Sequence, residues 1–143
     1  MNKDIQTIGS NPAGIKSRLA GKLMNFIHSN QYKAILKKYI IPRVDTTNNI
    51  VILDVGCGGG KLVQLFYSML EKSRVEAIDH SNDMVQLSKK VNNRGIRGGR
   101  VNILQGSADR LPYYDLSFDL VTAFDTINFW NDVINPLMKS NEF

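Results

Sequence analysis

The segment VILDVGCGGG at positions 51–60 constrains the fold more than any other part of this chain. Its first half is a β-branched apolar run, too short for a helix, and it predicts a strand. The glycines that follow permit a tight turn and let a ligand approach the backbone without meeting a Cβ atom. Beyond them, apolar residues recur at helical spacing at Leu62, Leu65, Phe66 and Met69. A strand, a glycine turn and a helix in this order predict an α/β unit whose helix N–H groups face a ligand.

The spacing of the glycines separates the ligand classes that use such a turn. A dinucleotide fingerprint counted from Gly56 needs Gly or Ala at position 61, which is Lys61. A phosphate-binding P-loop needs Ser or Thr directly after that lysine, and Leu62 follows it. The pattern D-x-G-x-G-x-G is met in full by Asp54, Gly56, Gly58 and Gly60. A carboxylate at position 54 would repel a pyrophosphate, but it suits a ligand that carries ammonium and sulfonium groups.

The rest of the chain alternates strands and helices. Apolar runs predict further strands at 74–79, 101–105 and 118–124, and helical spacing predicts helices at 59–71 and 81–91. This alternation indicates a parallel sheet with right-handed crossovers, which binds its ligands outside the carboxyl ends of the strands. We therefore expect residues 45–143 to form one α/β domain.

Two further helices are predicted before the first strand. Asn11 and Pro12 open the first, and Pro42 ends the second. Each has an apolar stripe: Ile15, Leu19, Leu23, Phe26 and Ile27 in the first, and Tyr32, Ile35, Leu36, Tyr39 and Ile40 in the second. We expect residues 1–44 to cover the sheet or to form a lid.

Several segments, in the right order, resemble the class I S-adenosylmethionine-dependent methyltransferases, and in particular the branch known as methyltransferase type 11. The matching segments are VILDVGCGGGKL, VEAIDHSNDMV and GSADRLPYYDLSFDLVTAF, and the opening stretch GKLMNFIHSN is similar to N-terminal helices of some bacterial members. The resemblance runs from about Gly21 to Trp130. It implies a Rossmann-like parallel sheet with helices on both faces, of which about four strands, in the order 3-2-1-4, are found here.

The resemblance also implies which residues bind S-adenosylmethionine. Asp79, at the end of the second strand, is expected to hydrogen-bond both ribose hydroxyls, a task that a carboxylate performs well. Asp109, beside Ala108, would meet the adenine amino group, and His80 and Met84 would lie against the adenine ring. The glycine turn contributes Asp54, Gly56, Cys57, Gly58 and Gly60.

For several of these residues a structural role stays open. Met84 is equally well explained by core packing on its helix. Asp109 could cap a turn before Leu111-Pro112, and Asp119 is expected to be structural rather than a ligand. Cys57 is expected to fill a tight loop rather than to act as a nucleophile. His28, on the N-terminal helices, is expected to have a packing or surface role.

The composition bounds the partners and the location. The formal net charge is +5, yet the basic residues are spread over helices and no basic–aromatic cluster occurs, so we expect no nucleic-acid partner. No apolar run approaches the roughly 20 residues of a membrane span, and we expect no membrane partner. A single cysteine, Cys57, fits a cytoplasmic protein. The spacing of the two histidines and the cysteine predicts no metal site.

The reaction that the resemblance implies is transfer of a methyl group to an unidentified small-molecule acceptor, with S-adenosylhomocysteine as the product. Such an enzyme contributes mainly orientation and exclusion of water. Asp125, after the fourth strand, is a candidate to position or deprotonate the acceptor, and it could equally cap a turn. No other catalytic residue is indicated.

The resemblance ends near Ile134, where the chain reads NDVINPLMKSNEF in place of the family's next helix and three further strands. The chain therefore looks C-terminally shortened, with 118–124 as an open edge strand. We expect the C-terminal tail or a second copy to cover this edge, which would make a homo-oligomer. Two other functions stay open: a shortened, non-catalytic module that binds the cofactor or dimerises, and a nicotinamide-dependent oxidoreductase, which Lys61 disfavours.

Overall fold

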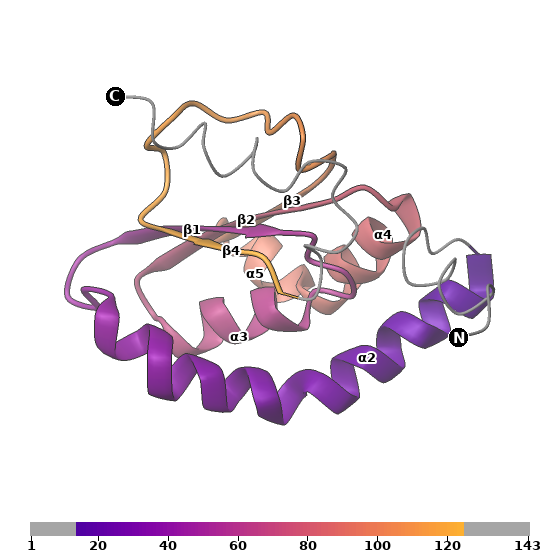
Figure 1. Ribbon diagram of the computed structural model, residues 1–143, viewed down its shortest axis with the longest axis horizontal. Helices are drawn as coiled ribbons and strands as arrows, with labels where there is room; N and C mark the ends of the chain where they lie inside the picture. Colours follow the sequence, from indigo (N-terminus) through magenta and orange to yellow (C-terminus); the bar gives the residue numbers. More distant parts are fainter. Residues whose placement is uncertain (1–13, 125–143) are drawn as a thin grey trace.

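The computed structural model describes residues 14–124, which form a four-stranded parallel sheet in the order β3-β2-β1-β4 (Figure 1). The strands are β1 (Ile50–Val55), β2 (Ser73–Asp79), β3 (Val101–Gln105) and β4 (Leu120–Thr122). This order and the parallel pairing confirm the predicted topology. The fourth strand is shorter than the predicted 118–124.

Alternation along β1 separates two apolar layers, because successive side chains of a strand point to opposite faces. On one face, Ile52 joins Val75 and Ile103 against Phe66 and Val85 from the helices. On the other face, the core residues Leu53, Val55 and Ile78 pack under Ala108, Leu111, Tyr113 and Phe118. Figure 1 shows α2 and α3 on the first side and the loop 106–119 on the second. Helices were predicted on both faces of the sheet. Within residues 14–124, helices cover one face and the 106–119 loop covers the other.

The helices that follow the sheet strands are α3 (Lys61–Met69), α4 (Asn82–Val91) and the short α5 (Asn93–Arg97). Gly60 is the N-cap residue of α3. The predicted cap of α4 is present, since the Ser81 hydroxyl accepts the Met84 N–H at 3.4 Å. These helices bury apolar side chains against β1, β2 and β3, and so they fix the carboxyl edge of the sheet in place.

One continuous helix, α2 (Gly14–Ile35), spans the first predicted helix and the beginning of the second. No Pro or Gly lies between positions 22 and 35 to break it. A π-helical turn, η1 (Leu36–Ile40), and a 3-10 turn, η2 (Ile41–Arg43), follow. Pro42 lies in the first turn of η2, where its missing N–H costs little. The predicted cap at Asn11 and Pro12 lies outside the described residues.

The apolar stripe of α2 does not cover the sheet. Ile15, Leu19, Leu23, Phe26 and Ile27 are all exposed. Because α3 and α4 already cover this face, α2 forms an outer layer and packs on those two helices. The Arg18 guanidinium pairs with Asp83 of α4 at 3.0 Å, and the backbone N–H of Gly14 also donates to Asp83. Near the C-terminal end of α2, Tyr32 packs against the core, and the buried Leu36 of η1 belongs to it.

No helix within residues 14–124 has both the length and the apolar character needed to cross a bilayer. The same part of the chain holds no group of three or more His, Cys, Asp or Glu side chains arranged to bind a metal ion.

Candidate functional site

The glycine turn lies where β1 ends, and it is fastened to the end of β2. The N–H groups of Gly56 and Cys57 both donate to the carbonyl oxygen of Ile78, at 2.7 and 3.1 Å. Gly56 and Gly58 have positive φ angles of 74° and 51°. The chain thus leaves β1, turns sharply beside β2 and enters α3, as the sequence predicts.

Gly60, the last glycine of the turn, has two reasons to be glycine. Its φ of 82° lies in the left-handed region, which side chains with a Cβ rarely adopt. A Cβ there would also stand 2.2 Å from the Ser88 hydroxyl and 2.5 Å from the Asn92 amide nitrogen. The turn therefore packs directly on α4, with no room for a side chain between them.

Two asparagines hold the backbone of the turn. The fully buried Asn92 donates its amide to the carbonyl oxygens of Gly60 and Ser88, each at 2.9 Å. Asn25 of α2 donates to the carbonyl oxygen of Gly59 at 2.8 Å. The sequence pattern did not identify either residue, since a single polar residue on a helix carries no signal of what it contacts. The turn is thus supported from β2, from α4 and from the N-terminal helix.

Asp79 at the end of β2 faces the turn and is almost fully buried. Its Oδ2 accepts the Gly58 N–H at 2.8 Å, and its Oδ1 accepts the Ser81 N–H at 2.9 Å. Each carboxylate oxygen has a second lone pair with which it can accept a ligand hydroxyl. Asp79 therefore links the turn, the second strand and the start of α4.

Asp54, in β1 beneath the turn, is also buried, and Thr122 of β4 donates a hydrogen bond to its Oδ1 at 2.8 Å. Burial raises the pKa of Asp54 to about 7; the Thr122 hydrogen bond opposes the rise and the Asp79 carboxylate adds to it. Two carboxyl groups thus meet at one edge of the sheet. An arrangement of this kind favours a ligand with positive charge, which would relieve their repulsion.

The other residues predicted to bind the cofactor lie at or near this edge of the sheet and differ in their exposure. His80 follows Asp79, with its Nδ1 3.7 Å from the Asp79 Oδ1, and its side chain is 46% exposed. Met84 is buried on α4, which fits the packing role that was left open for it. The loop that carries Ala108 and Asp109 begins at Gly106, whose N–H donates to the backbone oxygen of Asp79 at 2.9 Å.

Ala108 and Asp109 differ in their surroundings. Ala108 packs on the second face of the sheet, against the layer of Leu53, Val55 and Ile78. Asp109 is exposed, and its Oδ2 lies 3.2 Å from the Ser107 hydroxyl, which accepts the Asp109 N–H at 3.3 Å. The Ser107 side chain thus caps this turn, and the exposed Asp109 carboxylate reaches solvent.

Three other residues can be assigned from their contacts. Asp119 is structural, as predicted, because its Oδ2 accepts the Val51 N–H at 2.7 Å and its own N–H donates to the Val51 carbonyl oxygen. Cys57 is buried, and burial and the nearby charges of Asp54 and Asp79 raise its thiol pKa well above the ordinary value, which does not favour a nucleophile. His28 packs beside Tyr32 with ring centroids 5.5 Å apart. Asp125 lies outside the described residues.

Comparison with known proteins gives one consistent result. The model of a family described as a methyltransferase domain matches residues 52–140. A malonyl-[acyl-carrier protein] O-methyltransferase of Priestia megaterium is 25% identical over 89% of this chain and 39% of its own length. A ubiquinone/menaquinone biosynthesis C-methyltransferase of Shewanella piezotolerans is 30% identical over 77% of this chain and 45% of its own length. The chain therefore spans less than half of either relative.

A solved structure has the same fold. A complex that contains the Haloferax volcanii Trm112 methyltransferase activator matches with a TM-score of 0.72 and 22% identity. The match covers 84% of this chain and 49% of the matched chain. At this level of identity the likeness concerns the fold, and the family assignment rests on the sequence match.

Proposed function

Since the chain belongs to the methyltransferase-domain family, we propose that it binds S-adenosylmethionine at the carboxyl ends of β1 and β2 and serves methyl transfer. One observation carries this proposal most directly: the carboxylate of Asp79 fastens the glycine turn, while a second buried carboxyl group, Asp54, lies beneath it. The ligand of such a site should be positively charged and should bear hydroxyl groups. S-adenosylmethionine has both properties.

In this proposal each part of the cofactor meets a different part of the chain. The ribose hydroxyls would use the free lone pairs of Asp79, and the amino-acid portion would lie over the glycine turn. Asp54 would balance the positive charge from beneath. The adenine would lie along the start of the 106–119 loop, near Ala108 and Asp109, with His80 and Met84 as neighbours.

For methyl transfer itself, these residues would have few tasks beyond binding the cofactor. The bound cofactor would supply an activated methyl carbon, and the chain would orient that carbon and keep water away from it. Because the turn is held by Asn25, Asn92 and Asp79, its geometry is fixed before any ligand arrives. A fixed site loses less entropy on binding, which favours affinity.

We propose a small organic molecule as the methyl acceptor, and Asp125 as a candidate to position it. The two relatives are named as an O-methyltransferase of malonyl-[acyl-carrier protein] and as a C-methyltransferase of ubiquinone/menaquinone biosynthesis. We also propose that a second copy of the chain, or the C-terminal tail, pairs with β4. β4 is one of the two edge strands of the described sheet, and Val121 on it is half-exposed.

A second candidate function is cofactor binding without transfer. The observation that favours it is that the buried polar contacts of the site, such as those of Asp79 with Gly58 and of Asn92 with Gly60, hold the glycine turn, which is the part proposed to bind the cofactor. In this case S-adenosylhomocysteine would bind tightly, while no acceptor would be methylated.

Titration calorimetry with S-adenosylmethionine, S-adenosylhomocysteine and NAD tests the proposal. We expect binding of the two S-adenosyl compounds and none of NAD. An Asp79→Asn variant should lose about tenfold or more in affinity, because charge-assisted hydrogen bonds are weakened. Asp115→Asn, which changes an exposed loop carboxylate, is the matched control and should bind as the unmodified protein does.

Each alternative has its own outcome in this titration. Binding of NAD alone would point to an oxidoreductase. An unchanged affinity of a folded Asp79→Asn variant would refute the ribose assignment. Tight binding of S-adenosylhomocysteine without turnover of any acceptor would favour the second candidate.

A further inference from the structure

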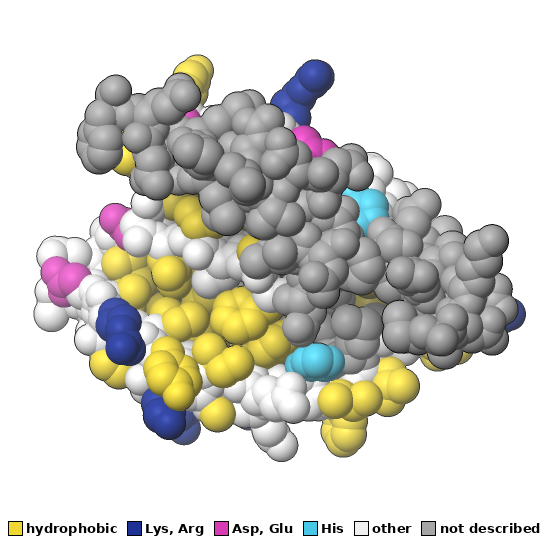
Figure 2. All heavy atoms as spheres, in the orientation of Figure 1, with side chains coloured by type: hydrophobic (Ala, Val, Ile, Leu, Met, Phe, Trp, Pro, Cys, Tyr) yellow, Lys and Arg dark blue, Asp and Glu magenta, His cyan; other side chains and the backbone are white. Residues whose placement is uncertain are grey.

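The outer face of α2, defined by Ile15, Leu19, Leu23, Phe26 and Ile27, is an exposed apolar strip. The exposed fractions of these residues lie between 53% and 81%, with Phe26 the highest. They recur every three or four residues and therefore share one side of the helix. Figure 2 shows hydrophobic side chains along the lower edge of the molecule, where α2 runs. Contiguous exposure of this kind marks a surface that meets a partner.

The charge of the same segment has a single sign. Residues 14–44 contain no Asp or Glu, and their basic residues are Lys16, Arg18, Lys22, Lys33, Lys37, Lys38 and Arg43. Asp83 of α4 approaches this segment and pairs with Arg18. The strip is thus accompanied by lysines on the same helix, and its complement is a surface that is apolar and negatively charged.

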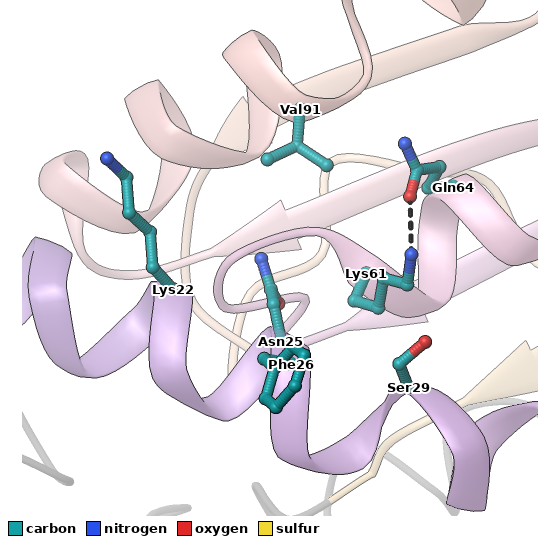
Figure 3. Close-up of a pocket in the computed structure, with 7 residues that line it drawn as sticks. All are labelled: Lys22, Asn25, Phe26, Ser29, Lys61, Gln64 and Val91. Atoms are coloured by element: carbon teal, nitrogen blue, oxygen red, sulfur yellow. Dashed lines mark hydrogen bonds between the residues drawn. The ribbon is translucent and has the colours of Figure 1, made fainter.

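A shallow pocket of about 260 Å³ borders the strip (Figure 3). Its walls come from three helices, and its lining residues are Lys22, Asn25, Phe26, Ser29, Lys61, Gln64 and Val91. Lys61 donates to the Gln64 side chain at 2.8 Å, so its ammonium is held at the pocket wall. The lining contains two lysines and no acidic side chain, so the surface beside the strip is also positively charged. Phe26 belongs to both the pocket and the strip.

Two features favour a lipid surface over another protein. The strip lies on the convex side of a single helix. Such a helix can insert its apolar side chains into a lipid layer without a partner of matching shape. A second copy of the chain would place two helices whose charged side chains are all basic against each other, and the repulsion of like charges disfavours that pairing. A helix with lysines and an exposed Leu/Phe face is the kind that lies in the plane of a membrane interface.

We propose that the outer face of α2 docks the protein on an anionic lipid surface. The apolar strip would enter the boundary between headgroups and acyl chains, and the lysines of residues 14–44 would remain at the headgroups. This mode needs no membrane-spanning helix. It does not depend on the methyltransferase proposal, because the residues that define the strip take no part in the proposed cofactor site.

Co-sedimentation with lipid vesicles tests this inference on the full chain. We expect binding to phosphatidylcholine vesicles that contain about 30% phosphatidylglycerol, weak binding to pure phosphatidylcholine, and loss of binding as salt is raised. A double variant, Leu23→Gln with Phe26→Gln, should bind at least about tenfold more weakly, since two inserted side chains are lost. Lys22→Glu should weaken binding about tenfold at low salt.

A matched control lies on the other side of the sheet. Arg110→Glu with Tyr114→Ser alters an exposed charge and an exposed aromatic side chain in the 106–119 loop, and it should bind vesicles normally. Unaltered melting temperatures would show that each variant is folded, as expected for exposed positions.

Three results would overturn the inference. The first is no binding to anionic vesicles, and the second is equal binding by the folded Leu23/Phe26 double variant. The third is binding without vesicle selectivity for anionic lipid. Self-association that this variant abolishes, without vesicle binding, would assign the face to a second copy. Binding of soluble polyglutamate in place of vesicles would assign it to an acidic protein.

Discussion

Replacing the buried Asp54 by Asn should change how the stability of the protein depends on pH. The folded-state pKa of Asp54 is raised from 3.8 to about 7, chiefly by burial. Between these values the folded protein keeps a proton that the unfolded chain has already released. The free energy of unfolding should therefore fall as the pH rises through this window, and a group with the raised pKa contributes its full stability only below it.

The magnitude follows from the two pKa values. The folded-state and unfolded-state pKa values of Asp54 differ by about three pKa units. Since one pKa unit corresponds to about 1.4 kcal/mol, Asp54 contributes about 4 kcal/mol to the fall in unfolding free energy. In Asp54→Asn the side chain has no charge to bury, and its oxygen can still accept the Thr122 hydrogen bond seen at 2.8 Å. The variant should therefore lose most of this pH dependence and should be more stable than the unmodified protein at neutral pH.

Urea denaturation across the window measures this difference. The slope of unfolding free energy against pH should be clearly negative for the unmodified protein relative to Asp54→Asn. Asp115→Asn, at an exposed carboxyl, serves as the control and should follow the unmodified protein. Parallel slopes for the unmodified protein and Asp54→Asn would refute the reasoning, because they would mean that the buried carboxyl is ionised as readily as in the unfolded chain.

Three shorter predictions concern the supports of the glycine turn. Gly60→Ala should destabilise the protein by roughly 2–4 kcal/mol in thermal melts, because of its positive φ and the contact with Ser88; a melting temperature like that of the unmodified protein would contradict the packing. Asn92→Ala should cost about 1–2 kcal/mol and weaken cofactor binding, since two hydrogen bonds are lost; calorimetry on the folded variant checks it. Asn25→Ala removes one hydrogen bond at the surface of the turn and should weaken binding by about fivefold with a smaller effect on stability; an effect on stability alone would count against a role in the site.

Much of the fold could be predicted from the sequence because its signals are local. The apolar run before Asp54, the glycine spacing and the helical repeat after it determine a strand, a turn and a helix in that order. The parallel pairing followed from the alternation of strands and helices and the strand order from the family resemblance, and the structure confirms both. The position of Asp79 opposite the glycine turn follows from the fact that carboxyl ends of parallel strands share one edge.

What the sequence missed depends on contacts between distant segments. Asn25 lies on the N-terminal helix, and nothing in its neighbourhood indicates that it reaches the turn 34 positions away. Thr122 meets Asp54 because of the register between β1 and β4, which hydrophobic patterning does not set. The sequence predicted that residues 1–44 cover the sheet or form a lid, and it could not choose between them, since periodicity gives the apolar face of a helix but not what that face meets.

A crystal structure of the protein with S-adenosylhomocysteine tests the central claim most directly. We predict that the ribose hydroxyls lie within hydrogen-bonding distance of the Asp79 carboxylate and that the amino-acid portion lies over the turn from Gly56 to Gly60, above Asp54. A ligand bound elsewhere, for example in the pocket between Lys22 and Lys61, or a complex that does not form at saturating ligand, would contradict the account.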